Sequence, residues 1–222
     1  MDEKPGDILI VTAHPSEGGA AERAMKAVPC SCELLITGVG GMSMSWALQK
    51  RFSAGNPPSL VINAGIAGSY TERFLPGNIV IPVSDCFADM GVDDNGTFVS
   101  LFSTSLADPD AWPFRGGRIQ CANNWSGLML HEFPGVIAAT VNMASGSIPV
   151  IDRIRREWNP DIETMEGAWF AYTCAMQKVD YLSLRAISNM VEPRNIEKWD
   201  IPLALERLES AIRETLKIIK SS

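Results

Sequence analysis

The sequence predicts a single α/β domain over residues 1–222 with a largely parallel central sheet. Short apolar runs rich in β-branched residues alternate with segments of helical periodicity, which is typical of parallel-sheet folds. A length of 222 residues suits one large domain, and no Gly-rich or Ser-rich linker divides it. The content of 46% hydrophobic and 20% charged residues is that of a globular protein.

The chain opens with two strand–helix pairs. An apolar run at 8–11 predicts the first strand, and Ser16 is the expected N-cap of a helix over 19–27. A second apolar run at 33–36 is followed by a glycine-rich turn and then by a helix over 42–51. Each strand therefore feeds directly into a helix, as in a parallel sheet.

The middle of the chain departs from this alternation. Runs rich in β-branched residues at 60–62, 79–83 and 136–141 predict three further strands. Between the last two, residues 85–125 carry turn sequences such as Asp93-Asp94-Asn95-Gly96. These turns predict antiparallel excursions and loops rather than helices.

The last third returns to long, regular elements. Helices are expected over 149–158 and 167–177, followed by a strand over 181–187 and a terminal helix over 202–220. In the terminal helix, leucine and isoleucine recur at three- and four-residue steps while charged residues take the other faces. This helix is therefore expected to pack on one side only.

The charge and the cysteines narrow the class of protein. Nineteen Lys and Arg against 26 Asp and Glu give a net charge of −7, which argues against a nucleic acid partner. No apolar run approaches the ~20 residues of a spanning helix, so neither a signal peptide nor membrane association is expected. Five cysteines, an odd number, are expected to be reduced, buried thiols in a cytoplasmic protein: Cys30, Cys32, Cys86, Cys121 and Cys174.

Two small-residue loops follow expected strands. The backbone N–H groups of Gly38-Val39-Gly40-Gly41 could face an anion or a polar ligand, although a tight turn alone also accounts for the glycines. Its spacing differs from a dinucleotide fingerprint, and it lacks the lysine of a Walker loop. The segment 63–69 is a second such loop at the carboxyl end of a strand, where open α/β sheets bind ligands.

Several charged residues stand out against apolar surroundings. Glu166 lies where a strand gives way to a helix, so it either caps the helix or binds ligand hydroxyls. Arg185 lies inside an apolar run and needs an acceptor, for which a structural ion pair would suffice. His14 and His131 are far apart and have no nucleophile elbow nearby, so a hydrolytic triad or a zinc site has little support.

Taken in order, these stretches resemble the nucleoside phosphorylase and nucleosidase superfamily over essentially the whole chain. The motifs that carry the resemblance are residues 11–17, 38–41, 63–68 with 77–81, 163–168 and 185–189. The resemblance implies a three-layer α/β/α fold around a mixed sheet, a purine nucleoside substrate, and no metal or organic cofactor. It also implies a homo-oligomer, whose contacts we expect from the aromatic-rich loops between Phe87 and Phe114.

The resemblance further implies the groups that carry the reaction. Glu17 matches the carboxylate that holds and activates water, while Arg185 and Ser188 match residues near that water and the base. Asn189 stands where adenine-releasing nucleosidases carry an aspartate. An amide offers a donor to O6 and an acceptor to N7–H of hypoxanthine, so this residue favours a 6-oxopurine.

The same resemblance implies the substrate contacts. Glu166 matches the acid that binds the ribose 2′ and 3′ hydroxyls, and Met165 is expected to pack on the sugar. Four further residues occupy substrate-binding segments of the family, although none is its stacking phenylalanine: Ala67, Gly68, Asn142 and Met143.

Two features of the chain bear on the reaction type. Residues 12–19 lack the arginine of a phosphorylase clamp, so hydrolysis is expected rather than phosphorolysis. Residues 188–195 with 199–202 resemble in particular the members that release hypoxanthine. An adenine-releasing nucleosidase and a non-enzymatic purine-nucleoside-binding protein remain as alternatives.

Overall fold

The computed structural model describes residues 8–221. Its strands are β1 (Ile8–Thr12), β2 (Cys32–Ile36), β3 (Leu60–Ser69), β4 (Ile79–Cys86), β5 (Gly91–Asp94), β6 (Thr97–Ser100), β7 (Phe114–Arg115), β8 (Arg118–Gln120), β9 (Gly135–Thr140), β10 (Ile162–Thr164) and β11 (Tyr181–Met190). Its helices are α1 (Pro15–Ala27), α2 (Gly41–Ser53), α3 (Asn124–Met129), α4 (Ile148–Trp158), α5 (Gly167–Gln177) and α6 (Ile201–Ser221). None of the helices in this part of the chain is long and apolar enough to cross a membrane.

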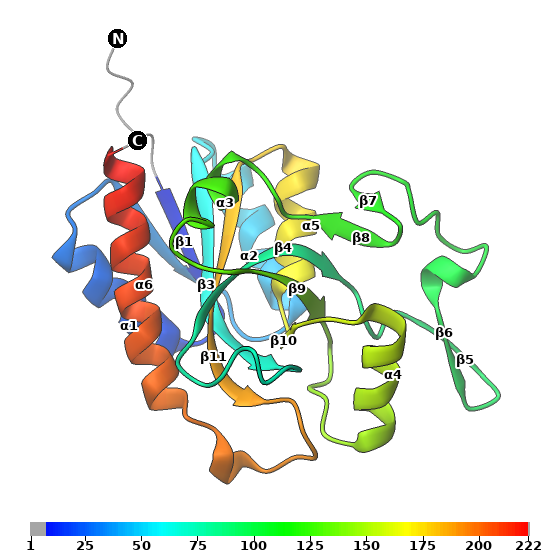
Figure 1. Ribbon diagram of the computed structural model, residues 1–222. Helices are drawn as coiled ribbons and strands as arrows, with labels where there is room; N and C mark the ends of the chain where they lie inside the picture. The colour runs from blue at the N-terminus through cyan, green and yellow to red at the C-terminus, as the bar shows by residue number, and fades with distance from the viewer. Residues whose placement is uncertain (1–7, 222) are drawn as a thin grey trace.

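Within residues 8–221, nine strands form one mixed sheet, as expected. Parallel pairings join β1 to β2 and β3, β3 to β11, and β9 to both β4 and β10. Antiparallel pairings join β3 to β10 and β4 to β11. The strands β3, β10, β9, β4 and β11 therefore close a circuit of hydrogen-bonded neighbours, while the β5–β6 hairpin stands away from the sheet (Figure 1).

Helices cover both faces of the sheet. In β1, Ile8 and Ile10 pack into the apolar cluster shared with α1 and α6, whereas Leu9 and Val11 pack into the cluster shared with α2 and α5. All five residues of β1 are buried, because a parallel strand covered on both faces has no solvent side. This arrangement confirms the expected α/β/α layers.

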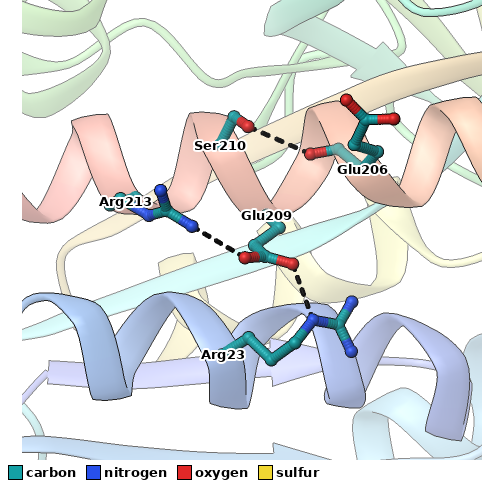
Figure 2. A network of polar contacts seen from close by, with 5 residues as sticks. All are labelled: Arg23, Glu206, Glu209, Ser210 and Arg213. Carbon is teal, nitrogen blue, oxygen red and sulfur yellow. Dashed lines mark hydrogen bonds and ion pairs between the residues drawn. The ribbon is translucent and has the colours of Figure 1, made fainter.

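The helices α1 and α6 lie side by side (Figure 1). Ala21 and Ala24 of α1 share the apolar cluster with Leu208 and Ile212 of α6, and the alanines let the two helices approach closely. Above this contact, Arg23 Nε lies 2.6 Å from Glu209, which also accepts a hydrogen bond from Arg213 (Figure 2). Because the Arg23 side chain is 57% exposed, this ion pair contributes at most about 1 kcal/mol, and the apolar contact holds the helices together.

The start of α1 differs from the prediction. The helix begins at Pro15, and the N-cap is His14 rather than Ser16. Proline is favoured in the first helical turn because it has no N–H to leave unpaired. The ring of His14 accepts the Ser16 N–H, and Glu17 accepts the backbone N–H of His14 in return. This reciprocal capping starts the helix four residues earlier than expected.

Two strands are longer than predicted. β3 continues to Ser69, so the segment 63–69 is a strand and not a loop. β11 continues to Met190, which includes Ser188 and Asn189. The second half of β3 pairs with β11 along its length and with β10 at its end, and the extension of β11 pairs with β3, and these pairings override the loop-like glycines.

The expectation of reduced cysteines is wrong for two of the five. Cys30 and Cys32 form a disulfide, because the turn before β2 brings their Cα atoms to 5.4 Å. Cys86, Cys121 and Cys174 are buried free thiols, as expected. Burial raises the pKa of each of these three thiols, so they behave as small apolar residues.

Candidate active site

A cavity of about 450 Å³ lies at the carboxyl ends of β1, β3, β10 and β11. Of the ten residues expected to form the site, all within the described chain, seven line this cavity: Glu17, Ala67, Gly68, Met165, Glu166, Ser188 and Asn189. Segments far apart in the sequence thus meet where these strands of the mixed sheet end.

Glu17 is held by three backbone N–H groups. Its Oε2 accepts hydrogen bonds from Ala13 and His14 at 3.1 and 2.9 Å, and its Oε1 accepts one from Ile66 at 3.0 Å. Only 6% of Glu17 is exposed. A carboxylate oxygen has two lone-pair positions, so Oε1 keeps one acceptor position free. Glu17 is therefore fixed in the cavity wall and can still bind a water molecule.

Arg185 lies behind Glu17 and does not line the cavity. A Cβ atom on Gly65 would lie 3.0 Å from Glu17 Oε1 and 3.2 Å from Arg185 Nη1, so the missing side chain gives these two groups room to approach. Arg185 donates to the carbonyls of Asn63 and Leu184, and its Nε has no hydrogen-bond partner among the described residues. Arg185 can therefore influence the site through its charge.

The surroundings of Arg185 set the balance of its charge. Burial lowers the pKa of Arg185, while the carboxylates of Glu166, Glu17 and Asp85 act in the opposite direction. Burial likewise raises the pKa of Asp85 to about 7, against the hydrogen bond from Thr140 and the charge of Arg185. One buried guanidinium thus faces three acidic side chains, of which Glu17 and Glu166 line the cavity.

Glu166 is the N-cap residue of α5, but its side chain does not cap the helix. Its Oε1 instead accepts the backbone N–H of Gly40 at 2.7 Å. Gly38 and Gly40 have φ angles of +90° and +93°, so glycine is required for the turn that presents this N–H. Burial raises the pKa of Glu166, while the Gly40 N–H and Arg185 favour its ionised form. The helix-capping interpretation is therefore wrong.

Ser188 and Asn189 are positioned by a β-bulge. The register between β11 and β3 shifts between Ile187 and Asn189, so Ser188 is the extra residue. A bulge re-aims the side chains beside it. Asn189 Oδ1 accepts a hydrogen bond from Ser188 Oγ at 2.8 Å, and Asn189 Nδ2 donates to the Met190 carbonyl at 3.0 Å. One N–H and one lone pair of the amide remain free for a ligand.

Two expected contact residues lie outside the cavity. Asn142 binds Asp89 through its backbone N–H and its side chain, and Met143 is 71% exposed. The following residues, Ala144 and Ser145, line the cavity in their place.

Sequence reasoning also missed Glu163, Trp199 and Ile201, which line the cavity. Glu163 is the middle residue of the three-residue strand β10 and opens the 163–168 motif, but no local signal in the sequence gives it a role. The segment of Trp199 is tied to β11 by a hydrogen bond from the Asp200 N–H to the Ser188 carbonyl.

A family model described as the phosphorylase superfamily matches residues 34–222. The chain belongs to this superfamily. A futalosine hydrolase from Acidothermus cellulolyticus is 31% identical over 206 residues, covering 90% of this chain and 80% of that protein. One from Streptomyces coelicolor is 27% identical over 223 residues, covering 96% and 91%. The structure of futalosine hydrolase from Helicobacter pylori matches with a TM-score of 0.76 at 15% identity, covering 98% of both chains.

These relatives confirm the resemblance to nucleoside phosphorylases and nucleosidases, and to the futalosine hydrolases among them. Within the phosphorylase superfamily the chain is an N-glycosyl hydrolase, and the expectation of an enzyme is confirmed. The α/β/α fold agrees with that of the solved relative.

Proposed function

We propose that this enzyme hydrolyses the N-ribosyl bond of futalosine, releasing hypoxanthine and dehypoxanthine futalosine, as a step of the futalosine route to menaquinone. The observation that carries the proposal is the free donor and free acceptor of Asn189 at the cavity, which suit O6 and N7–H of a departing hypoxanthine. The relatives named futalosine hydrolase support the same substrate.

In this proposal Glu17 holds the attacking water through the free lone pair of Oε1 and takes its proton as the bond to ribose forms. As the bond to ribose breaks, N7 of the departing base takes a proton from solvent, and the resulting N7–H donates a hydrogen bond to Asn189 Oδ1. Arg185 balances the negative charge of Glu17 and Glu166 from below. All of these groups are fixed by backbone contacts before substrate enters, which favours the transition state.

Glu166 is proposed to bind the ribose 2′ and 3′ hydroxyls. Its Oε1 is engaged by Gly40, and an ionised carboxylate still offers further acceptor positions to two adjacent hydroxyl donors. Met165, which follows β10 and also lines the cavity, is proposed to pack on the apolar face of the sugar. Hydrogen bonds from the hydroxyls strengthen as positive charge develops on the ribose, so they assist the reaction as well as binding.

The proposal includes a homo-oligomer, supported by a different surface from the one predicted. The prediction rests on Phe87, Met90, Phe98, Phe102 and Trp112, and of these only Trp112, at 73% exposure, is left largely uncovered. An apolar patch instead surrounds the start of α2: Ile36, Val39, Met42 and Trp46. Because Val39 also lines the cavity, a second copy on this patch would adjoin the site. Light scattering that gives a monomer at assay concentration would contradict this part.

One assay tests the main proposal. The protein is incubated with futalosine, aminofutalosine, inosine and methylthioadenosine, with and without phosphate, and the released base is identified. We expect hypoxanthine from futalosine at a rate independent of phosphate. Dependence on phosphate would indicate a phosphorylase, faster release of adenine from methylthioadenosine would indicate an adenine-specific nucleosidase, and binding without turnover would indicate a non-enzymatic protein.

A further inference from the structure

Glu163 is a buried acid of the cavity wall with no part in the mechanism described so far. It lies in β10, only 7% exposed, and lines the same cavity as Asn189. A buried carboxylate needs hydrogen-bond donors, and it is a specific acceptor for any ligand that brings another one.

The sheet register places Glu163 and Asn189 on either side of one glycine. Gly68 of β3 pairs with Glu163 of β10 and with Asn189 of β11. Paired residues on neighbouring strands direct their side chains to the same face, and neighbouring strands lie about 4.8 Å apart. A Cβ atom on Gly68 would lie 3.2 Å from Asn189 Nδ2 and 2.9 Å from Val191 Cγ2. The missing side chain therefore gives Asn189 and Val191 room to lie close above the β3 backbone, with Glu163 on the other side of the same glycine.

Glu163 is held rigidly and yet retains a free acceptor position. Its Oε2 accepts hydrogen bonds from the hydroxyls of Tyr70 and Ser145, each at 2.5 Å, and its Oε1 accepts only the Ser145 N–H, at 2.9 Å, among the described residues. Burial and the nearby acid raise the pKa of Tyr70, so its hydroxyl stays a donor. With two lone-pair positions on each oxygen, Oε1 can accept one more hydrogen bond.

We propose that Glu163 accepts a hydrogen bond from N1–H of the purine base and so selects 6-oxopurines. The inference rests on the proposed function and deepens it. A 6-oxopurine carries a donor at N1, whereas a 6-aminopurine carries a lone pair there, which would face the carboxylate. Asn189 contacts O6 and N7–H while Glu163 contacts N1–H, so the two side chains, which flank Gly68 and line the same cavity, bind neighbouring atoms of one base.

The first test compares substrates in a conservative variant. In Glu163→Gln the amide can turn its NH₂ toward N1 of a 6-aminopurine. We expect the ratio of kcat/KM for futalosine over aminofutalosine to fall about 10-fold or more. Tyr70→Phe is the matched control, because it removes one donor to Glu163 but leaves the acceptor in place, and it should change both substrates by the same factor. An equal loss on both substrates in Glu163→Gln would overturn the proposal.

The second test needs no variant and no turnover. Calorimetry compares binding of hypoxanthine and 1-methylhypoxanthine, which lacks the N1 donor, to the wild-type protein. We expect the methylated base to bind at least 10-fold more weakly, and equal affinity would refute the role of Glu163. If the wild-type protein cleaves neither nucleoside while this difference in base affinity is present, the proposed function fails and the base-recognition role stands.

Discussion

Replacement of Glu17 by glutamine removes the proposed base with the smallest possible change in shape. The three backbone N–H groups around Glu17 decide how the amide sits. Placing the NH₂ group at Oε2 would oppose the N–H groups of Ala13 and His14, whereas placing it at Oε1 opposes only that of Ile66. The second orientation loses fewer hydrogen bonds, and it directs the NH₂ group toward the position where the water would bind.

The expected loss of stability in Glu17→Gln is too small to explain the expected loss of activity. One buried N–H left facing a donor costs about 1 to 3 kcal/mol. For a chain of this length, each kcal/mol lowers Tm by about 2 to 4 °C. A domain stable by about 5 to 15 kcal/mol still remains almost entirely folded after that loss. The expected fall in kcat of about 10²-fold or more therefore cannot come from unfolding, and it reports the lost general base.

The assay is kcat on futalosine together with Tm, with Ala24→Gly as the matched control. Ala24 is buried in the same helix, far from the cavity lining, and a helical glycine costs about 1 kcal/mol. We expect the control to lower Tm and leave kcat nearly unchanged. The reasoning is refuted if Glu17→Gln retains near-normal kcat, or if the control loses activity to the same extent.

Three further predictions concern the base, the sugar and the buried acid Asp85. Asn189→Asp is expected to lower kcat/KM for futalosine by roughly 5- to 150-fold and to shift the preference toward aminofutalosine, because a carboxylate then faces O6. An equal loss of kcat/KM on both substrates would mean that Asn189 only shapes its strand end. Glu166→Gln keeps an acceptor for the Gly40 N–H, so Tm should change little while kcat falls and KM rises, and a large drop in Tm would indicate a structural role instead. The pKa of Asp85 rises from 3.8 in the unfolded chain to about 7 in the folded one, so its stabilising contribution is present below pH 4 and is lost as the pH rises through 7. The urea midpoint of Asp85→Asn should therefore fall less than that of the wild type between pH 5 and pH 8. Parallel profiles of the two proteins would contradict this.

Much of the architecture is predictable because strands and helices differ in hydrophobic period. The helix over 167–177 and the strand pattern of residues 8–11 are both found where the sequence predicts them. The start of α1 is not, because capping depends on which side chain reaches which N–H, and His14 is an uncommon N-cap. The segment 63–69 has the composition of a loop, and only its pairing with distant strands makes it part of β3.

The residues of the candidate site also divide into those that the sequence predicts and those that it does not. Glu17, Glu166 and Asn189 could be identified from motifs because each lies at the end of a regular element. Residues 142–143 could not be placed, since the contact of Asn142 with Asp89 joins two irregular segments. Glu163 was missed because its significance depends on the register that sets it opposite Gly68, and register between distant strands is not visible in local sequence.

The closed circuit of strands also bears on how this pocket could change during evolution. Gly68, Glu163 and Asn189 belong to three strands of that circuit, so every one of them is locked to its neighbours by main-chain hydrogen bonds. Backbone adjustment for a different base would break pairings around the whole ring. A new base preference must therefore arise by exchange of side chains at fixed positions. His14, Trp199 and Ile201 also line the pocket, but they lie at helix starts and in a connecting segment outside that circuit, so this part of the wall is free to diversify in the substituents it admits.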